Sequence, residues 1–125
     1  MIKIKPIKQK GFSGPASLKM VLEYYGIKKS IKELAKITGT TIKKETSEAR
    51  LARTARNLGL KVHVKENSNI HTLRNYLNKK IPIIIEWFSP ETGGNYSVVV
   101  GIDKKKIYIA NPYFGKIKSY DINWF

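Results

Sequence analysis

The sequence predicts a single α+β domain, spanning residues 1–125, in which helices come first and strands follow. With 125 residues, of which 42% are hydrophobic, the chain can bury a core without disulfides or metal. Apolar residues recur at helical spacing in the first half, whereas the second half carries alternating and continuous apolar runs joined by short turns. We therefore expect an N-terminal helical layer packed on one side of a twisted antiparallel sheet.

The stretch from Gln9 to Gly26 predicts a polar turn that leads into a buried helix over residues 14–25. Ser13 suits the N-cap of this helix, Pro15 suits its first turn, and Gly26 suits its end. The first turn of a helix concentrates free N–H groups and the positive end of the dipole, which favours a reactive nucleophile or a developing anion. An ordinary capped core helix is the alternative interpretation of this stretch.

Further helices are expected before the central strands. Ser30 and Glu33 form a capping-box pattern that opens a short helix ending at Gly39. A third helix is predicted over residues 46–58, and Asn69 caps a short fourth one. The third helix is expected to place five apolar side chains on its inner face: Ala49, Leu51, Ala52, Ala55 and Leu58.

Two segments with alternating apolar residues predict additional strands. Residues 1–8 alternate Ile and Lys up to Pro6 and predict a lead-in strand, and residues 60–64 predict a half-buried strand. The last four predicted strands are joined by short turns, one of which Asp103 is expected to stabilise. These four strands cover residues 81–87, 95–103, 106–110 and 116–120.

The charge is the strongest compositional feature, because 24 Lys and Arg residues against 9 Asp and Glu residues give a formal net charge of +15. Such a balance favours anionic partners, including nucleic acid, acidic protein surfaces and anionic lipid. The lysines occur in short dispersed clusters, and no helix-turn-helix, zinc-finger or RNA-recognition signature is present. We therefore expect non-specific adhesion to anionic partners at low salt.

The absence of cysteine excludes a disulfide framework, a Cys-based zinc site and a thiol nucleophile in the chain as written. The acidic residues are too isolated to predict a metal site, and no cofactor is expected. The basic N-terminus lacks an apolar core of signal-peptide length, and no run approaches the ~18 apolar residues of a membrane span. These features predict a cytoplasmic domain without a membrane span.

Three motifs occur in a specific order: QKGFSGPASLKMVLEYYG near the start, GNYSVVVGID at residues 94–103 and IYIANPYFG at residues 107–115. Together they resemble peptidase family C39, a papain-like fold that cleaves double-glycine leader peptides in bacteriocin exporters. The resemblance covers nearly the whole chain. It implies a papain-like arrangement of helices and sheet, and a peptide or leader-peptide segment as partner.

In active members of that family the first motif reads Cys-Gly-Pro-Ala-Ser, the second Gly-His-Tyr and the third Asp-Pro-Tyr. The cysteine is the nucleophile, the histidine is its general base, the aspartate orients the histidine, and an upstream glutamine supplies an oxyanion-hole donor. By position, Gln9 matches the glutamine and Ser13 the cysteine, whereas Asn95 replaces the histidine and Asn111 the aspartate. The segment from Gln9 to Gly14 is one residue shorter than in active members, so Ser13 can also match the residue before the cysteine.

These substitutions remove the chemistry of the triad. A serine hydroxyl needs a positioned base to take its proton, and the neutral amide of Asn95 is essentially non-basic in water. Asn111 could orient a histidine, as asparagine does in other papain-like enzymes, but neither His63 nor His71 falls at a catalytic position. The resemblance therefore implies a catalytically inactive domain that retains a peptide-binding or recruiting role.

Trp87 and Tyr113 are the candidate walls of the peptide cleft. Two alternatives stay open beside the inactive domain. One is a residual hydrolase that uses Ser13, or a modified cysteine that the sequence does not show. The other is a basic nucleic-acid-associated protein in which the site is vestigial.

Overall fold

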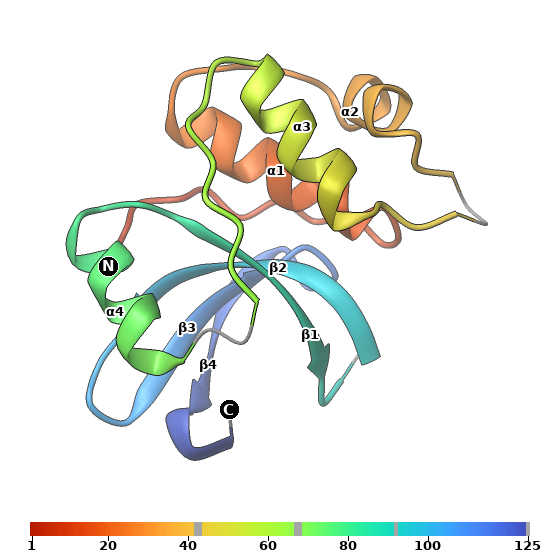
Figure 1. Ribbon diagram of the computed structural model, residues 1–125. Coiled ribbons are helices and arrows are strands. Elements are labelled where there is room, and N and C mark those ends of the chain that lie inside the picture. Colours follow the sequence, from red (N-terminus) through yellow and green to blue (C-terminus); the bar gives the residue numbers. More distant parts are fainter. Residues whose placement is uncertain (42–43, 67–68, 92, 125) are drawn as a thin grey trace.

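The computed structural model describes residues 1–41, 44–66, 69–91 and 93–124, with residue 124 described by its backbone alone. Figure 1 shows helices packed against a twisted sheet. The described helices, in chain order, are α1 (Ser13–Tyr24), α2 (Ile31–Thr38), α3 (Glu48–Asn57) and α4 (Ile70–Asn78). The described strands are β1 (Ile83–Ser89), β2 (Gly93–Ile102), β3 (Lys106–Asn111) and β4 (Lys116–Asp121), followed by a short 3₁₀ helix, η1 (Ile122–Trp124).

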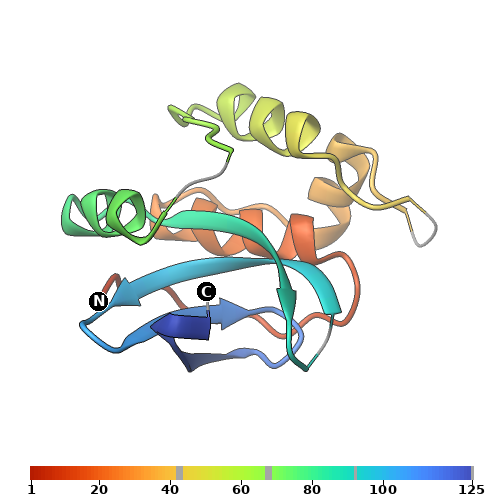
Figure 2. The same ribbon diagram turned by 60° about the horizontal axis from the view of Figure 1, so that its bottom comes forward.

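The sheet is antiparallel throughout, and its strands lie in the order β1-β2-β3-β4. Helix α1 packs across β2 and also contacts α2 and α3, while α4 packs on β2 and β1. Figure 2 shows the helices on one side of the sheet. The predicted α+β architecture, with a helical layer on one face of an antiparallel sheet, is confirmed.

The core consists of two clusters of buried side chains. The first lies between the sheet and helices α1 and α4, and its centre is made by Met20, Val98 and Ile109. The second lies among α1, α2 and α3, and Tyr96 of β2 joins this cluster from the sheet. Tyr96 therefore connects the strand end at which Asn95 lies to the helical layer.

The helices lie where the sequence predicted them, but their ends differ by one or two residues: α1 covers Ser13–Tyr24 instead of 14–25, and α3 covers Glu48–Asn57 instead of 46–58. Phe12, in a left-handed conformation with φ 52°, occupies the N-cap position, and no side chain caps the helix there. Ser13 is the first helical residue, so its prediction as N-cap is wrong. The reason is that the Ser13 hydroxyl accepts a hydrogen bond from the backbone of β2 instead of from its own helix.

The other caps follow from the sequence. Ser30 and Glu33 form the predicted capping box, and α2 ends at Gly39 with φ 72°. Asn69 caps α4 as predicted, through Thr72 N–H. Ala49 was expected on the inner face of α3, but it is exposed because the buried side of this helix is made by Leu51, Ala52, Thr54 and Ala55.

Two predicted strands are wrong. Residues 1–8 and 60–64 carry no strand; the first segment buries alternate side chains as the pattern suggested, whereas in the second Leu60 and Val62 are half-buried and Val64 is exposed. Ile2 and Ile4 are buried, and Ile2 N–H bonds the carbonyl of Val100 at 2.8 Å. Alternation reports which side chains face the core, but a strand also needs a neighbour with which to form a ladder. Side chains of both segments pack on the core, but neither segment forms a ladder.

Candidate functional site

The site begins at the turn that leads into α1. Gly11 and Phe12 both adopt left-handed conformations, with φ 75° and 52°, and these two residues reverse the chain direction after Gln9. This region favours glycine, and a bulky residue held there costs about 1–2 kcal/mol. The turn places Ser13 at the first position of α1, where backbone N–H groups have no partner within the helix.

Ser13 is tied to β2 through Tyr96. The backbone N–H of Tyr96 donates to Ser13 Oγ at 3.0 Å, and the phenol of Tyr96 donates to the Thr46 carbonyl at 3.0 Å. Burial, together with the nearby carboxylates Glu86 and Glu48, raises the pKa of Tyr96 above the usual range of a phenol. The phenol therefore remains protonated and remains a donor, and β2, α1 and the 40–46 loop meet at this one residue.

Asn95 and Asn111 form the second part of the site. Asn95 Nδ2 donates to Asn111 Oδ1 at 3.0 Å, and the backbone N–H of Tyr113 donates to the same oxygen at 3.0 Å. Because a backbone N–H can only donate, this contact fixes which end of the Asn111 amide is the oxygen. Asn111 is 1% exposed and Asn95 is half-buried, and the pair joins β2 to β3, the two central strands of the sheet.

Two atoms of this pair have no partner among the described residues. Asn95 Oδ1 and Asn111 Nδ2 are both buried and make no hydrogen bond. Buried polar atoms normally find partners, and leaving one unmade costs about 1–3 kcal/mol. The pair thus presents one acceptor and one donor that the fold itself does not use.

Gln9 reaches the same place through its backbone. Its N–H donates to the Pro112 carbonyl at 2.8 Å, which fixes the N-terminal segment against the turn after β3. Its side-chain amide donates to the carbonyl of the adjacent Lys10 at 3.3 Å. The structure therefore links all four predicted positions: Gln9 through Pro112, Ser13 through Tyr96, and Asn95 to Asn111.

The two predicted cleft residues differ in their surroundings. Trp87 lies opposite Asn95 in the β1–β2 register, and its indole N–H donates to Ser97 Oγ at 3.0 Å. Its ring packs edge-on against Tyr120, with the centroids 5.1 Å apart. Tyr113 is 40% exposed and packs against Phe114. Tyr113 is thus accessible beside the site, whereas the Trp87 ring is held by its strand neighbours.

Sequence reasoning missed the support beneath Ser13. Gly14 is buried against Thr46, and a Cβ at Gly14 would lie 2.6 Å from Thr46 Oγ1. Thr46 belongs to a chain of buried hydroxyls with Thr40 and Thr38, and Thr38 donates to the Leu34 carbonyl at 2.7 Å. That last bond sets the direction of the chain, since each hydroxyl has one proton: Thr46 donates to Thr40, and Thr40 to Thr38. A glycine directly after Ser13 was the sequence signal for this close contact.

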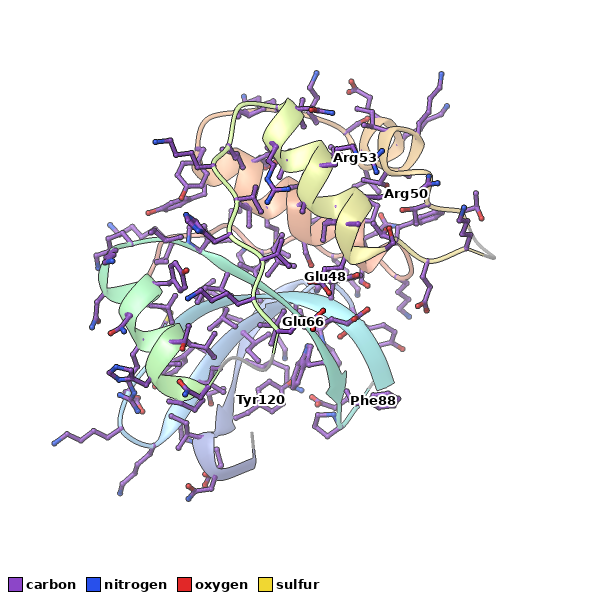
Figure 3. All side chains as sticks on the ribbon, viewed as in Figure 1. Glu48, Arg50, Arg53, Glu66, Phe88 and Tyr120 are labelled. Atoms are coloured by element: carbon purple, nitrogen blue, oxygen red, sulfur yellow. The ribbon has the colours of Figure 1, made fainter. Side chains whose placement is uncertain are left out.

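The remaining pKa shifts belong to contacts outside the site. Burial raises the pKa of Tyr120 to about 12, helped by its hydrogen bond to Glu91. Burial opposes ionisation of Glu91, but its bonds with Lys118 and Tyr120 outweigh that effect and lower its pKa. Figure 3 shows Tyr120 and the exposed Phe88 at the sheet end of the molecule. These contacts attach the β1–β2 turn to β4.

Neither histidine occupies one of the four predicted site positions. His63 lies in the exposed segment before α4, and His71 lies exposed on α4. Within the described residues, no group of three His, Cys, Asp or Glu side chains is arranged to hold a metal ion. The site can offer hydrogen bonds to a ligand, but none of Gln9, Ser13, Asn95 and Asn111 takes up a proton at neutral pH.

The helical layer, the antiparallel sheet and the meeting of the start of α1 with β2 define a papain-like fold. Comparison with family models identifies the family to which this domain belongs. The Peptidase C39 family model matches residues 3–123, and the chain belongs to this family. No helix among the described residues combines the length and apolar character needed to cross a membrane.

Two curated relatives come from Lactococcus lactis subsp. lactis. The lactococcin-A transport/processing ATP-binding protein LcnC is 29% identical over 100 residues, which cover 79% of this chain and 13% of that protein. The lactococcin transport/processing ATP-binding protein LcnC-like, from strain IL1403, is 30% identical over 102 residues with the same coverage. The chain thus spans about an eighth of the length of these relatives, 13% in each case.

Two solved structures share the fold. The peptidase domain of Streptococcus ComA, a bi-functional ABC transporter involved in a quorum-sensing pathway, superposes with a TM-score of 0.79 at 24% identity, covering 100% of this chain and 90% of that one. A double glycine motif protease from an AMS/PCAT transporter, in complex with the leader peptide, superposes with a TM-score of 0.78 at 25% identity, covering 97% and 81%.

Proposed function

We propose that this domain binds a peptide segment at the site formed by Ser13, Asn95 and Asn111, and does not cleave it. The observation that carries the proposal is the Asn95–Asn111 hydrogen bond of 3.0 Å, which joins β2 to β3 beside the start of α1. Asparagine holds the position that a catalytic histidine would need, and it keeps the contact to residue 111 that would orient a histidine. The amide supports binding without supplying a base.

The free hydrogen-bonding atoms of the site support a peptide as the ligand. Asn95 Oδ1 is an unused acceptor and Asn111 Nδ2 is an unused donor, and a peptide group carries one N–H and one carbonyl. Both atoms are buried, so a peptide would bond them only after these side chains rotate. The similar protease from an AMS/PCAT transporter has been crystallised in complex with the leader peptide, and this likeness supports a peptide as the ligand. Trp87 and Tyr113 remain our candidates for the walls of this site.

A hydrolase that uses Ser13 is not favoured by the contacts of this residue. Ser13 Oγ accepts a hydrogen bond from the Tyr96 backbone N–H, which cannot take a proton from the hydroxyl. Serine is a weak acid and needs a base within about 2.6–3.2 Å to become a nucleophile. The substituted positions offer amides instead.

The test uses a fluorescent peptide that contains a double-glycine segment with apolar residues before it. We expect the wild-type chain to bind this peptide in calorimetry and to leave it intact in mass spectrometry after prolonged incubation. Ser13→Ala, which removes only the hydroxyl, is the matched control for residual chemistry. Cleavage by the wild type that disappears in Ser13→Ala would overturn the inactive assignment, and a lack of any binding would overturn the binding role.

A further inference from the structure

The end of the molecule that lies away from the site is formed by turns from three parts of the chain. The site lies where α1 begins, and α1 runs from there across β2. Figures 1 and 2 show the C-terminal end of α1, the turn between α4 and β1, and the β2–β3 turn on the side of the molecule opposite the start of α1. We call this part of the protein the distal end.

Side-chain hydrogen bonds hold the three turns of the distal end together. The hydroxyl of Tyr24 donates to the Lys80 carbonyl at 3.0 Å, which joins the end of α1 to the end of α4. Arg74 Nη2 donates to the Asp103 carbonyl at 3.0 Å, which joins α4 to the β2–β3 turn. The distal end is therefore one continuous surface whose parts have fixed relative positions.

Four exposed lysines lie in two of these turns. Lys79 and Lys80 follow α4, and Lys104 and Lys105 occupy the β2–β3 turn. Within the described residues, none of the four takes part in an ion pair. Their charges are therefore available to an anionic partner.

The acidic residues near these lysines are fewer and are engaged elsewhere. Asp103 accepts hydrogen bonds from two backbone N–H groups of its own turn and from the hydroxyl of Tyr108. Glu23 pairs with a lysine one turn before it on α1. Asp121 lies opposite Lys106 in the β3–β4 register, and for this reason Lys106 is not counted with the four lysines. Even with the charge of Asp103 included, the distal end keeps a net positive charge.

Lys80 has a backbone conformation that glycine adopts more easily. Its φ is 62°, and it ends α4 with two hydrogen bonds: its own N–H bonds the Leu77 carbonyl at 2.9 Å, and the N–H of Ile81 bonds the Tyr76 carbonyl at 3.0 Å. Helices that end in this pattern commonly have glycine at this position, because a side chain disfavours a positive φ. A lysine here lowers stability and adds a charge to the surface, which favours a role for that charge outside the fold.

Two apolar side chains are exposed at the same end. Tyr25 is 46% exposed and Ile81 is 38% exposed. The ring of Tyr25 packs edge-on against that of Tyr24, with the centroids 5.0 Å apart, and Tyr24 is bonded to the turn that contains Ile81. A single exposed apolar residue is ordinary, but these two adjoin the lysines, since Ile81 directly follows Lys80.

An anionic lipid bilayer fits this combination better than nucleic acid does. The negative surface potential of such a bilayer attracts lysines, and a lysine can keep its charge among the headgroups while its alkyl stem covers apolar surface. Tyrosine is enriched at the level of the headgroups, because its ring is apolar and its hydroxyl is polar. Sequence-independent contacts with nucleic acid are electrostatic and give no role to an exposed isoleucine.

We propose that the distal end binds the surface of a bilayer that contains anionic lipid. The four lysines contact the headgroups, and Tyr25 and Ile81 lie at the boundary between headgroups and acyl chains. The site, at the other end of α1, then faces away from the bilayer and stays accessible to the solution. This surface is independent of the proposed peptide site and shares no residue with it.

The test measures co-sedimentation of the whole chain with vesicles at about 150 mM salt, where long-range attraction is largely screened. One set of vesicles is phosphatidylcholine alone, and the other is phosphatidylcholine mixed with phosphatidylserine. Lys79→Gln/Lys104→Gln removes two charges from the distal end. The matched control, Lys32→Gln/Lys36→Gln, removes two charges from exposed positions on α2, which Figure 1 shows away from the distal end.

We expect the wild type to bind the mixed vesicles and not those of phosphatidylcholine alone. The distal variant should lose at least ~10-fold in binding to the mixed vesicles, because each lysine near the bilayer contributes to the attraction, and the α2 variant less than about threefold. Equal losses in both variants would mean that net charge alone attracts the vesicles, and would overturn the inference. So would a lack of wild-type binding to the mixed vesicles. Unfolding temperatures verify that both variants are folded.

Lys80→Gly separates the charge of this residue from its effect on the fold. Glycine relieves the positive φ, so we expect a higher unfolding temperature together with weaker binding to the mixed vesicles. A general loss of structure cannot explain weaker binding by a more stable protein. Unchanged binding would overturn the assignment of this charge to the bilayer.

Tyr25→Trp tests the apolar part of the distal end. The emission of this variant, compared with that of the wild type and its two tryptophans, should shift to shorter wavelength when mixed vesicles are added. An unshifted emission would overturn the placement of Tyr25 at the acyl boundary. Duplex DNA at the same salt is the last comparison, and DNA binding as strong as vesicle binding through the same lysines would overturn the choice of a bilayer.

Discussion

The two ends of β2 use their polar groups differently. At one end, Asn95 has a buried oxygen without a partner, and Asn111 across from it has a buried nitrogen without one. At the other end, Asp103 uses both carboxylate oxygens: Oδ1 accepts from the N–H groups of Lys105 and Lys106 at 2.8 and 2.7 Å, and Oδ2 accepts from Tyr108 at 2.6 Å. One strand thus connects an incompletely satisfied end to a fully satisfied one.

This comparison distinguishes polar groups that stabilise the fold from polar groups that the fold leaves unbonded. A turn has only to stabilise the chain, and the predicted role of Asp103 in its turn is confirmed by those three bonds. Unused buried donors and acceptors lower stability, so their retention at one end is typical of a site that completes its hydrogen bonds with a ligand. Substitutions at the two ends of β2 should therefore have different effects.

The largest effect should come from introducing a cysteine and a histidine at the site end. The double variant Ser13→Cys/Asn95→His supplies a nucleophile and a base, and Asn111 is already placed to orient the histidine. We expect cleavage of the double-glycine peptide to rise at least ~10³-fold above wild type. Ser13→Cys alone is the control and should stay near the wild-type rate; equal activity of the single variant would show that position 95 does not act as the base.

Glycine-to-alanine substitutions test how tightly the protein is packed near the site and near the other end of β2. Gly14→Ala would bring a methyl group to 2.6 Å from Thr46 Oγ1, which is held in the hydroxyl chain. We expect a loss of about 1–3 kcal/mol in the free energy of unfolding. At Gly101, near the other end of β2, the nearest atom is Met1 Cγ at 2.9 Å, and that side chain is exposed and flexible. Gly101→Ala should therefore change stability by less than about 1 kcal/mol in urea unfolding.

A stabilising change is expected one helical turn beyond Ser13. Ser17 is fully buried at 0% exposure, and its hydroxyl has no partner among the described residues. Ser17→Ala removes an unsatisfied polar group and improves helix propensity, so we expect a gain of about 0.5–1 kcal/mol. Thermal unfolding measures it. A loss of stability would show instead that the hydroxyl is satisfied in solution.

The smallest effect should come from the satisfied end and should depend on pH. The hydrogen bond from Tyr108 and those from two backbone N–H groups lower the pKa of Asp103 from 3.8 to about 2. Because the folded-state pKa is depressed, the stabilisation is present above the unfolded pKa and is lost as the pH falls through about 2. The melting temperature of Asp103→Asn should thus lie slightly below that of wild type at neutral pH, and the difference should vanish between about pH 4 and pH 2. A difference that persists at pH 2 would contradict the assignment.

Much of the fold could be predicted from local signals. The capping box of Ser30 and Glu33, the cap at Asn69 and the short turns between the last four strands all depend on residues close in sequence. The two wrongly predicted strands, at residues 1–8 and 60–64, failed because strand pairing depends on a neighbouring strand that the local sequence does not reveal. Alternating burial of Ile2 and Ile4 was visible in the sequence, but the lack of a ladder partner was not.

Prediction of the site was limited in the same way, because contacts between distant parts of the chain are not visible in the local sequence. Motif resemblance indicated Gln9, Ser13, Asn95 and Asn111, and the Asn95–Asn111 bond agrees with their expected proximity. The acceptor role of Ser13 toward Tyr96 depends on the approach of β2 to α1, two elements 83 residues apart along the chain. The prediction of an N-cap at Ser13 used only its neighbours in sequence, and the tertiary contact replaced that role.

The loop between Thr40 and Thr46 is held at its base by the buried hydroxyl chain, and Thr41 and Lys44 close it with backbone bonds of 2.9 and 3.3 Å. Thr41 and Lys44 are exposed. Lengthening a loop whose ends are fixed adds little closure entropy, about 0.6 kcal/mol for each doubling. Extra residues inserted between Thr41 and Lys44 should therefore be tolerated, and a fluorophore-bearing tag could be carried there to report on ligands without extending either terminus.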